Sequence, residues 1–84
     1  MTKPVKRVRV QYFAIFREQR GVSMETVSTS ADTAGELYEE LRSRHGFTLP
    51  AERLRAAVND EFSPWEAPLR DGDSLVFIPP VAGG

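Results

Sequence analysis

The sequence predicts an α+β domain built from two strands, one main helix and then two or three further strands. Three observations favour this class: an alternating apolar segment near the start, one well-capped amphipathic helix in the middle, and a short apolar strand near the end. The chain has 84 residues and no cysteine, so it can form one small core that no disulfide supports. We expect a single domain over residues 1–78 and an extended, flexible tail over residues 79–84.

The first strand is predicted in the segment VKRVRVQYFAIF, residues 5–16. Its side chains alternate between an apolar face, Val8, Val10, Tyr12 and Ala14, and a mostly polar face, Arg7, Arg9, Gln11 and Phe13. A basic cluster also lies here, formed by Lys3, Lys6, Arg7 and Arg9. We interpret this cluster as a solvated strand edge, because charged residues at an edge discourage pairing with another sheet.

The second strand is predicted in the segment VSMETVST, residues 22–29, which is rich in β-branched residues. Gly21 supplies the turn before it, and the short link favours an antiparallel hairpin with the first strand. Met24 and Val27 can share a face only if the strand contains a bulge, so the sequence leaves the register of this pair open.

The main helix is predicted within the segment SADTAGELYEELRSRHG, residues 30–46. Thr33 can cap its first turn while Glu36, three residues later, reaches back to it, and Gly46 can supply the left-handed residue that ends it. One apolar stripe follows the helical spacing and is assigned to the core: Ala34, Leu37, Tyr38 and Leu41.

The segment after the helix is predicted to be an irregular connection with one helical turn that begins at Pro50. A short strand at residues 55–58 and turn residues at 59–61 follow it. Residues 63–73 contain two prolines and an Asp-Gly turn signal, so they are predicted to form a loop.

The last strand is predicted in SLVFI, residues 74–78, and the two prolines after it lack the amide hydrogen that would continue a ladder. Leu75 and Phe77 point to the face that the helix covers, and Ile78 points to the other face. One helix covers only one face of the sheet. Phe13, Ile78 and Phe62 are therefore expected on the uncovered face as an apolar patch of the kind that often marks a partner surface.

Composition and charge argue against several classes of function. Eleven basic and twelve acidic residues give a net charge of −1, which does not favour a protein that binds nucleic acid by neutralising its phosphates. No apolar run has the length of a membrane span and the start lacks a signal-peptide pattern, so we expect a cytoplasmic protein without membrane contacts. His45 is interpreted as a helix-capping residue, Asp71 and Asp73 as loop acceptors rather than metal ligands, and Trp65 as a half-buried loop anchor.

The sequence ends in PPVAGG, residues 79–84. Glycine has no Cβ, so Gly83 and Gly84 can enter a narrow channel and present a terminal carboxylate to a bound nucleotide. Pro79 and Pro80 hold the base of the tail extended, and a tail of this length reaches at most about 20 Å. A carboxylate is a poor electrophile, so it must be activated, for example as an acyl-adenylate, before a nucleophile can attack it.

These segments resemble the family of molybdopterin synthase small subunits, which are sulfur carriers. The resemblance covers residues 8–84 and is carried by VQYFAIFRE, by LRAAVNDEF and by LRDGDSLVFIPPVAGG. The combination of a DGD turn, an apolar strand, two prolines and Val-x-Gly-Gly is far more specific than the diglycine alone. The family has the ubiquitin-like β-grasp fold, so the resemblance implies a mixed sheet of about four to five strands with one main helix packed on one face.

The resemblance also implies a chemistry and a set of partners. In this family a ubiquitin-activating-like adenylyltransferase uses ATP to adenylate the terminal glycine, and sulfur from a persulfide donor converts it into a thiocarboxylate. The carrier then inserts its tail into the large subunit of molybdopterin synthase, within a heterotetramer of two small and two large subunits. There it donates sulfur to cyclic pyranopterin monophosphate for molybdenum cofactor biosynthesis. No permanently bound cofactor is implied, and the catalytic residues are expected on the large subunit.

Matched residue by residue, the resemblance assigns the sulfur to Gly84 and makes Gly83 its slim neighbour. The positions implied to contact the partner are Phe13, Phe62, Ile78, Pro79, Pro80, Val81 and Ala82. Two of them, Phe13 and Ile78, are also the residues that strand alternation places on the uncovered face.

Three alternatives remain open at this point. The first is a β-grasp sulfur carrier for thiamine, cysteine or tRNA thiolation. The second is a ubiquitin-like protein modifier that is joined to lysines, although the arginine that precedes the diglycine of ubiquitin is missing here. The third is a structural domain whose tail has no role.

Overall fold

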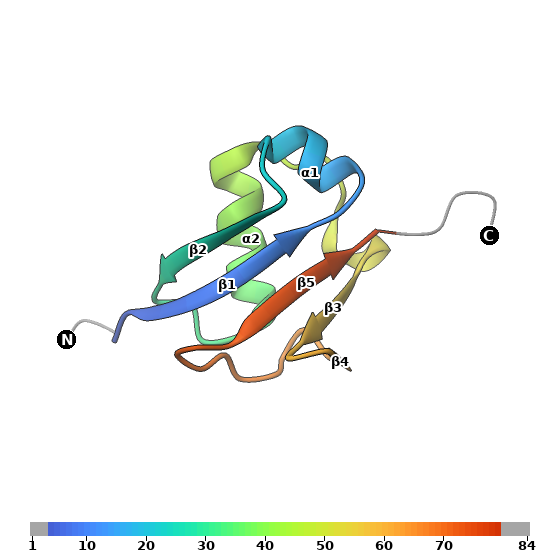
Figure 1. Ribbon diagram of the computed structural model, residues 1–84. Coiled ribbons are helices and arrows are strands. Elements are labelled where there is room, and N and C mark those ends of the chain that lie inside the picture. Colours follow the sequence, from blue (N-terminus) through green and yellow to red (C-terminus); the bar gives the residue numbers. More distant parts are fainter. Residues whose placement is uncertain (1–3, 80–84) are drawn as a thin grey trace.

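The computed structural model describes residues 4–79 of the chain. Within them the chain forms a five-stranded sheet, two α-helices and one short 3-10 helix, η1 (Figure 1). The elements, in chain order, are β1 (Lys6–Tyr12), α1 (Ile15–Arg20), β2 (Met24–Thr29), α2 (Ala34–His45), η1 (Ala51–Arg53), β3 (Arg55–Val58), β4 (Glu61–Ser63) and β5 (Ser74–Ile78).

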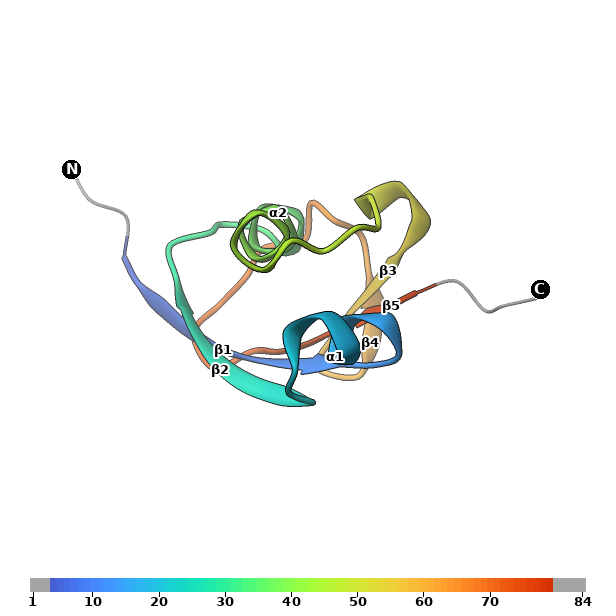
Figure 2. The same cartoon turned by 90° about the horizontal axis from the view of Figure 1, so that it is seen from above.

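The sheet is mixed and has the strand order β2-β1-β5-β3-β4. β1 and β5 run parallel, whereas the other neighbouring strands pair antiparallel. α2 crosses one face of the sheet, and in the described part of the chain no other long helix covers the opposite face (Figure 1, Figure 2). The arrangement confirms the predicted α+β class with one main helix on one face. We call the face opposite α2 the uncovered face.

The limits of α2 follow from local chemistry that the sequence predicts. The Thr33 hydroxyl accepts a hydrogen bond from the amide of Glu36 at 3.1 Å, which satisfies a free donor of the first turn. Gly46 ends the helix in the left-handed region with φ 72°, and its amide donates to the carbonyl of Arg42 at 2.8 Å.

The core lies between α2 and the sheet. The four predicted side chains of α2 are each 0 % exposed: Ala34, Leu37, Tyr38 and Leu41. They meet the inward side chains of the two central strands, Val8, Val10, Tyr12, Leu75 and Phe77. Tyr38 is the central ring: it meets Phe77 edge-on with 5.0 Å between centroids, and its hydroxyl donates to the Leu49 carbonyl at 2.6 Å.

Replacing Leu37 by alanine is expected to lower the free energy of unfolding by about 2–5 kcal/mol, because the cavity left in this close-packed core cannot collapse fully. Urea titration followed by the fluorescence of Trp65, the one tryptophan of the chain, measures the change. The control is Glu39→Ala on the solvent side of the same helix, which should change stability by less than about 0.5 kcal/mol. Equal urea midpoints for the two variants would contradict the assignment of Leu37 to the core.

The segment after β1 differs from the prediction. The predicted strand continued to Phe16, but β1 ends at Tyr12 and the chain then forms α1. Ala14, which was predicted on the apolar face, is exposed, whereas the ring of Phe16 is 0 % exposed. The alternating pattern did not reveal α1 for two reasons. The helix has only 6 residues, and its one buried side chain, Phe16, stands at a position that would also point inward if the strand continued.

The interpretation of the basic cluster as a strand edge is wrong for Arg9. β1 pairs with β2 over residues 6–11 and with β5 over residues 9–12, so Arg9 lies inside the sheet, whereas Lys6 and Arg7 pair with β2 alone. Arg7 and Arg9 are exposed because they alternate with buried valines and therefore point from the uncovered face into solvent. Lys6 is half-buried and donates to the carbonyl of Ala31 at 2.8 Å.

β2 pairs antiparallel with β1, as predicted, and its register is continuous. Val27 lies opposite Val8 and is buried, whereas Met24 lies opposite Gln11 and is exposed. The two therefore occupy opposite faces without a bulge. The predicted short link between the strands contains the helix α1, and Gly21, which was predicted as the turn residue, ends that helix with φ 87°.

The second half of the chain follows the prediction closely. η1 begins after Pro50, β3 occupies the predicted residues 55–58, and β5 occupies the predicted residues 74–78. Asn59 and Asp60 form the turn with φ of 52° and 71°. The three-residue strand β4 follows and supplies the fifth strand of the sheet. It corrects the prediction at two residues, because Glu61 was assigned to the turn and Ser63 to the loop, and both instead pair with β3.

Candidate partner-binding face and tail base

Three apolar side chains on the uncovered face form what we call the apolar patch: Phe13, Phe62 and Ile78. Phe13 is 44 % exposed and Phe62 is 66 % exposed, which is unusual for rings of this size. All three line one surface pocket, together with Gln11, Ala57, Asp60 and Val76. The structure thus brings together residues that lie far apart in the sequence, and their contact with a partner stays a prediction.

Strand pairing explains why these side chains converge. Phe62 lies opposite Ala57 of β3, and Ala57 lies opposite Val76 of β5. Phe13 directly follows β1, whose Tyr12 lies opposite Phe77 of β5. Because Ala57 is small, the larger side chains on either side of it form the walls of the pocket.

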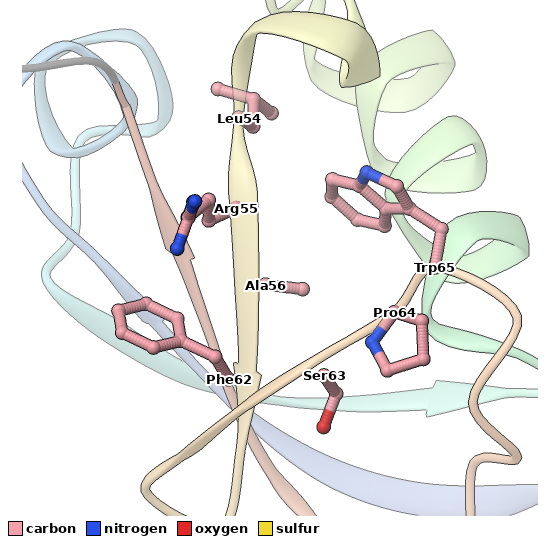
Figure 3. Close-up of a pocket in the computed structure, with 7 residues that line it drawn as sticks. All are labelled: Leu54, Arg55, Ala56, Phe62, Ser63, Pro64 and Trp65. Atoms are coloured by element: carbon pink, nitrogen blue, oxygen red, sulfur yellow. The ribbon is translucent and has the colours of Figure 1, made fainter.

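Arg55 is a residue of this face that the sequence analysis missed. Its guanidinium carbon lies 5.4 Å from the centroid of the Phe62 ring, a distance at which the ring quadrupole attracts a cation. Figure 3 shows Arg55 and Phe62 on one side of β3 and Trp65 on the other, around a second pocket of about 320 Å³. The alternation of β3, with Ala56 buried and Arg55 exposed, is the signal that could have placed Arg55 on this face.

The base of the predicted tail lies at the border of the apolar patch. β5 ends at Ile78, and Pro79 is half-buried at the point where the chain leaves the sheet. Pro79, Ile78, Phe62 and Arg55 line a common surface pocket. The other predicted tail residues lie outside the described residues: Pro80, Val81, Ala82, Gly83 and Gly84.

A network centred on the Glu25 carboxylate holds the end of α1 in place; Glu25 lies opposite the buried Val10, on the side of the sheet that α2 covers. Arg20, at the end of α1, donates two hydrogen bonds to it, at 3.0 Å from Nε and 2.8 Å from a terminal nitrogen. The Tyr12 hydroxyl donates a third at 2.6 Å, and the Nε2 atom of His45 lies 3.8 Å from Oε2 of Glu25. One carboxylate thus joins β1, β2 and the carboxyl-terminal ends of both helices.

The network shifts the acid–base properties of its members. The hydrogen bonds from Arg20 are the main cause that holds the pKa of Glu25 below its ordinary value, and the bond from Tyr12 acts in the same direction. Burial lowers the pKa of His45, the positive charge of Arg20 lowers it further, and these effects outweigh the attraction of Glu25. Burial raises the pKa of Tyr12 above its ordinary range, so this hydroxyl remains a donor.

These shifts predict that the protein becomes less stable in acid. For both Glu25 and His45 the folded-state pKa lies below the unfolded-state value, so each contributes stability above that value and loses it as the pH falls through the folded-state pKa. The loss begins below the ordinary values of 6.5 for histidine and 4.5 for glutamate. The urea concentration at the midpoint of unfolding should therefore fall in two stages between pH 7 and pH 3. The first stage follows protonation of His45, and the second, at lower pH, follows protonation of Glu25.

Glu25→Gln separates the two contributions. At pH 7 it should lower the free energy of unfolding by about 1–3 kcal/mol, because Arg20 and Tyr12 lose a charged acceptor. The difference from the unmodified chain should shrink below the ordinary glutamate value of 4.5. A difference that stays constant down to pH 3 would show that the ionised carboxylate does not stabilise the fold.

The remaining predicted roles concern residues of the loop before β5. Asp71 accepts a hydrogen bond from the amide of Arg7 at 2.8 Å, and Asp73 accepts one from the amide of Arg70 at 2.8 Å, which confirms both as loop acceptors. The half-buried ring of Trp65 stacks on Phe77 with 6.1 Å between centroids, which confirms it as an anchor.

Among residues 4–79, no three histidine, cysteine, aspartate or glutamate side chains gather as metal ligands would. The helices in the same range are too short or too polar to cross a membrane.

Comparison with known sequences identifies the family. The sequence profile of the ThiS family matches residues 10–84. The chain is 34 % identical over 80 residues to the molybdopterin synthase sulfur carrier subunit of Escherichia coli (strain K12), an alignment that covers 92 % of this chain and 99 % of that protein.

Comparison with solved structures agrees. A Pyrococcus furiosus protein whose name assigns it to subunit 1 of a molybdopterin converting factor superposes with a TM-score of 0.74 at 30 % identity, over 90 % of this chain and 99 % of its own. A Helicobacter pylori chain, from a complex of subunits 1 and 2 of molybdopterin-converting factor, gives 0.62 at 29 % identity, over 93 % and 99 %. A ubiquitin from Caldiarchaeum subterraneum, at 16 % identity and a TM-score of 0.64 over 96 % and 100 %, shares the fold, which confirms the ubiquitin-like β-grasp architecture. The chain therefore belongs to the ThiS family and, within it, to the family of molybdopterin synthase sulfur carrier subunits.

Proposed function

We propose that this protein is the sulfur carrier subunit of a molybdopterin synthase and that Gly84 carries the sulfur as a thiocarboxylate. The observation that supports this most strongly is the near full-length match to the Escherichia coli sulfur carrier subunit. The geometry is consistent with it, because the exposed apolar patch lies at the end of the sheet from which the chain continues toward its two glycines. The role requires a free carboxyl group at Gly84.

The proposed loading reaction begins with ATP bound to an adenylyltransferase. A carboxylate oxygen of Gly84 attacks the α-phosphorus, pyrophosphate leaves, and the resulting acyl-adenylate is an electrophile. The terminal sulfur of a persulfide then attacks the acyl carbon and displaces AMP, which leaves an acyl disulfide. A thiol reduces its sulfur–sulfur bond, so that the thiocarboxylate remains on Gly84 and the two thiol sulfurs form a disulfide. The chain contains no cysteine, so the persulfide and the thiol come from the partner proteins.

The proposed delivery step assigns different tasks to the two subunits. The tail enters the large subunit, where the sulfur is transferred to cyclic pyranopterin monophosphate, and two successive carriers supply the two sulfur atoms of the product. The large subunit contributes the acids, bases and substrate-binding groups, within a heterotetramer of two small and two large chains. The complex of subunits 1 and 2 from Helicobacter pylori supports a large-subunit partner of this kind.

The proposed contact surface is the apolar patch together with Pro79 and the tail residues after it. Burying Phe13, Phe62 and Ile78 against a partner removes exposed apolar area from water, and aromatic residues of this kind are typical binding hot spots. The patch borders the base of the tail. Docking of the patch therefore aims the tail at one point of the partner.

Intact mass spectrometry tests this function. After incubation with an adenylyltransferase, ATP, a persulfide donor and a thiol that reduces the acyl disulfide, we expect the mass to rise by about 16 Da, the difference between one sulfur and one oxygen atom. No gain with an adenylyltransferase that loads another carrier would contradict the proposal. Co-purification of the loaded protein with a thiazole synthase in place of the large subunit would keep the loading chemistry and assign a different sulfur acceptor, and isopeptide-linked adducts would indicate a protein modifier.

A further inference from the structure

The turn that joins β1 to α1 contains an unusual backbone conformation. Ala14 has φ 51° and ψ −124°, close to the values of about +60° and −120° that define the first central residue of a type II′ turn. The Phe16 amide donates to the Phe13 carbonyl at 3.1 Å, which is the hydrogen bond that closes such a turn. Glycine is the residue that normally occupies this position, because a Cβ atom is crowded there.

Ala14 is exceptional within this protein as well. Every other position with a positive φ in the described range is a glycine, Asn59 or Asp60, residues that tolerate this region. Ala14 is exposed, so burial of its methyl group in the core does not compensate for the strain. A strained residue without a compensating core contact is a candidate for a functional role, because such strain gathers at functional sites.

The elements on both sides prevent the turn from relaxing. β1 is paired on both edges up to its end, and the Phe16 ring is 0 % exposed, with its centroid 5.2 Å from that of Phe47. The far end of α1 is held by the two hydrogen bonds from Arg20 to Glu25, and the Glu18 amide donates to the Ala14 carbonyl at 3.1 Å. Glycine at this position would have more accessible backbone conformations than alanine, because it lacks a Cβ atom.

The turn lies where the proposed contact surface meets the tail. Phe13, the residue before Ala14, belongs to the apolar patch and is 44 % exposed. β1 and β5 run parallel with Tyr12 opposite Phe77, so Ala14 and Pro79 each lie two residues beyond this aligned pair. The strained turn therefore directly follows a residue of the apolar patch, at the end of β1 that lies beside the end of β5.

We propose that Ala14 is a positioning residue: its strained turn lowers the stability of the carrier and in return fixes Phe13 in the orientation that the large subunit binds. The proposal rests on the proposed function, because it concerns the same contact. Fixing an exposed side chain before binding favours affinity, since fewer conformations are lost when the complex forms.

Ala14→Gly tests the proposal because it should raise the thermal stability of the protein and at the same time weaken its binding to the large subunit. We expect the thermal midpoint to rise by about 4–8 °C, because the strain is relieved. The hydrogen exchange of the Phe16 and Glu18 amides should become faster, and the dissociation constant for the large subunit should rise about 3- to 10-fold. The matched control is Ala67→Gly, at a loop alanine without a positive φ, which should lower the midpoint and leave the dissociation constant unchanged.

A chain that carries D-alanine at position 14 separates strain from rigidity. A positive φ is favourable for a D-residue, so the turn keeps one conformation without strain. We expect this chain to be more stable than the natural one and to retain its affinity for the large subunit.

Each outcome decides the proposal. An unchanged or lower thermal midpoint for Ala14→Gly would show that the backbone at Ala14 is not strained. A raised midpoint with an unchanged dissociation constant would show that Ala14 does not position Phe13 for binding. An affinity loss for D-alanine as large as that for glycine would also overturn it. Failure of the natural chain to bind the large subunit would contradict the proposed function instead, while the thermal shift would still report the strain.

Discussion

A chain that ends at Gly83 is expected to take up no sulfur. Removal of Gly84 draws the terminal carboxyl back by about 3.5 Å, and a misplacement of even 1 Å at a reacting centre can cost about 100-fold in rate. We therefore expect the gain of about 16 Da to fall below detection under conditions that load the full chain completely. The measurement is intact mass spectrometry after incubation with the adenylyltransferase, ATP, a persulfide donor and a thiol.

An added residue is the second arm of this experiment. A phenylalanine after Gly84 restores length but places a bulky side chain where the proposed channel admits only glycine, so loading should fail again. Both variants should unfold at the same urea concentration as the full chain, because the last residues lie beyond β5 and its core contacts. Loading of the extended chain, without proteolysis that restores Gly84, would exclude the terminal carboxyl as the site of sulfur attachment.

The second large effect is expected at the apolar patch. Phe62→Asp places a charge where an apolar ring is proposed to be buried, and we expect its affinity for the large subunit to fall at least about 30-fold, the loss typical of a hot spot. Phe13→Asp should act in the same direction. Titration calorimetry with the purified large subunit measures both. Loading by the adenylyltransferase is a separate readout that shows whether the same patch also serves that enzyme.

Val22→Asp is the matched control for these variants. Val22 is also exposed, at 38 %, but it precedes β2 and does not line the pocket of the apolar patch. The same charge there should leave the affinity within about twofold, because the residue lies outside the proposed contact. If Val22→Asp weakens binding as much as Phe62→Asp, the effect comes from net charge, and the apolar patch is not the contact surface.

The parts of the fold that could be predicted are those whose residues carry a local signal. Thr33 and Gly46 mark the ends of α2 by their own hydrogen bonds and backbone preference, so the sequence alone locates that helix. The alternation of Val8, Val10 and Tyr12 likewise marks β1 and its buried face. Pairing between distant strands has no such signal, which is why β1 could be mistaken for an edge strand.

α1 could not be predicted, because its formation depends on tertiary contacts. A six-residue helix is unstable alone, and this one is held by the burial of Phe16 and by the hydrogen bonds between Arg20 and Glu25. The strained turn at Ala14 has no sequence signal either, because alanine is rarely found in that conformation.

The candidate site was predicted in part. The sequence analysis placed Phe13, Ile78 and Phe62 together on one face, and the structure adds that Phe62 reaches this face from the short strand β4. Arg55 was missed, because its contact with Phe62 depends on the pairing of β3 with β4. Strand alternation indicates the face of a sheet on which a residue lies, whereas its neighbours across the sheet follow from strand order and register.

A single-turnover experiment with the loaded carrier tests the central claim most directly. Carrier that has gained about 16 Da is mixed with the large subunit and cyclic pyranopterin monophosphate, and both its mass and the sulfur content of the pterin are followed. We expect the mass to return to its starting value while sulfur appears in the pterin, with two carriers consumed for each dithiolene. Pterin that gains sulfur while the carrier keeps its added mass, or with a carrier that was never loaded, would show that the sulfur does not travel on Gly84.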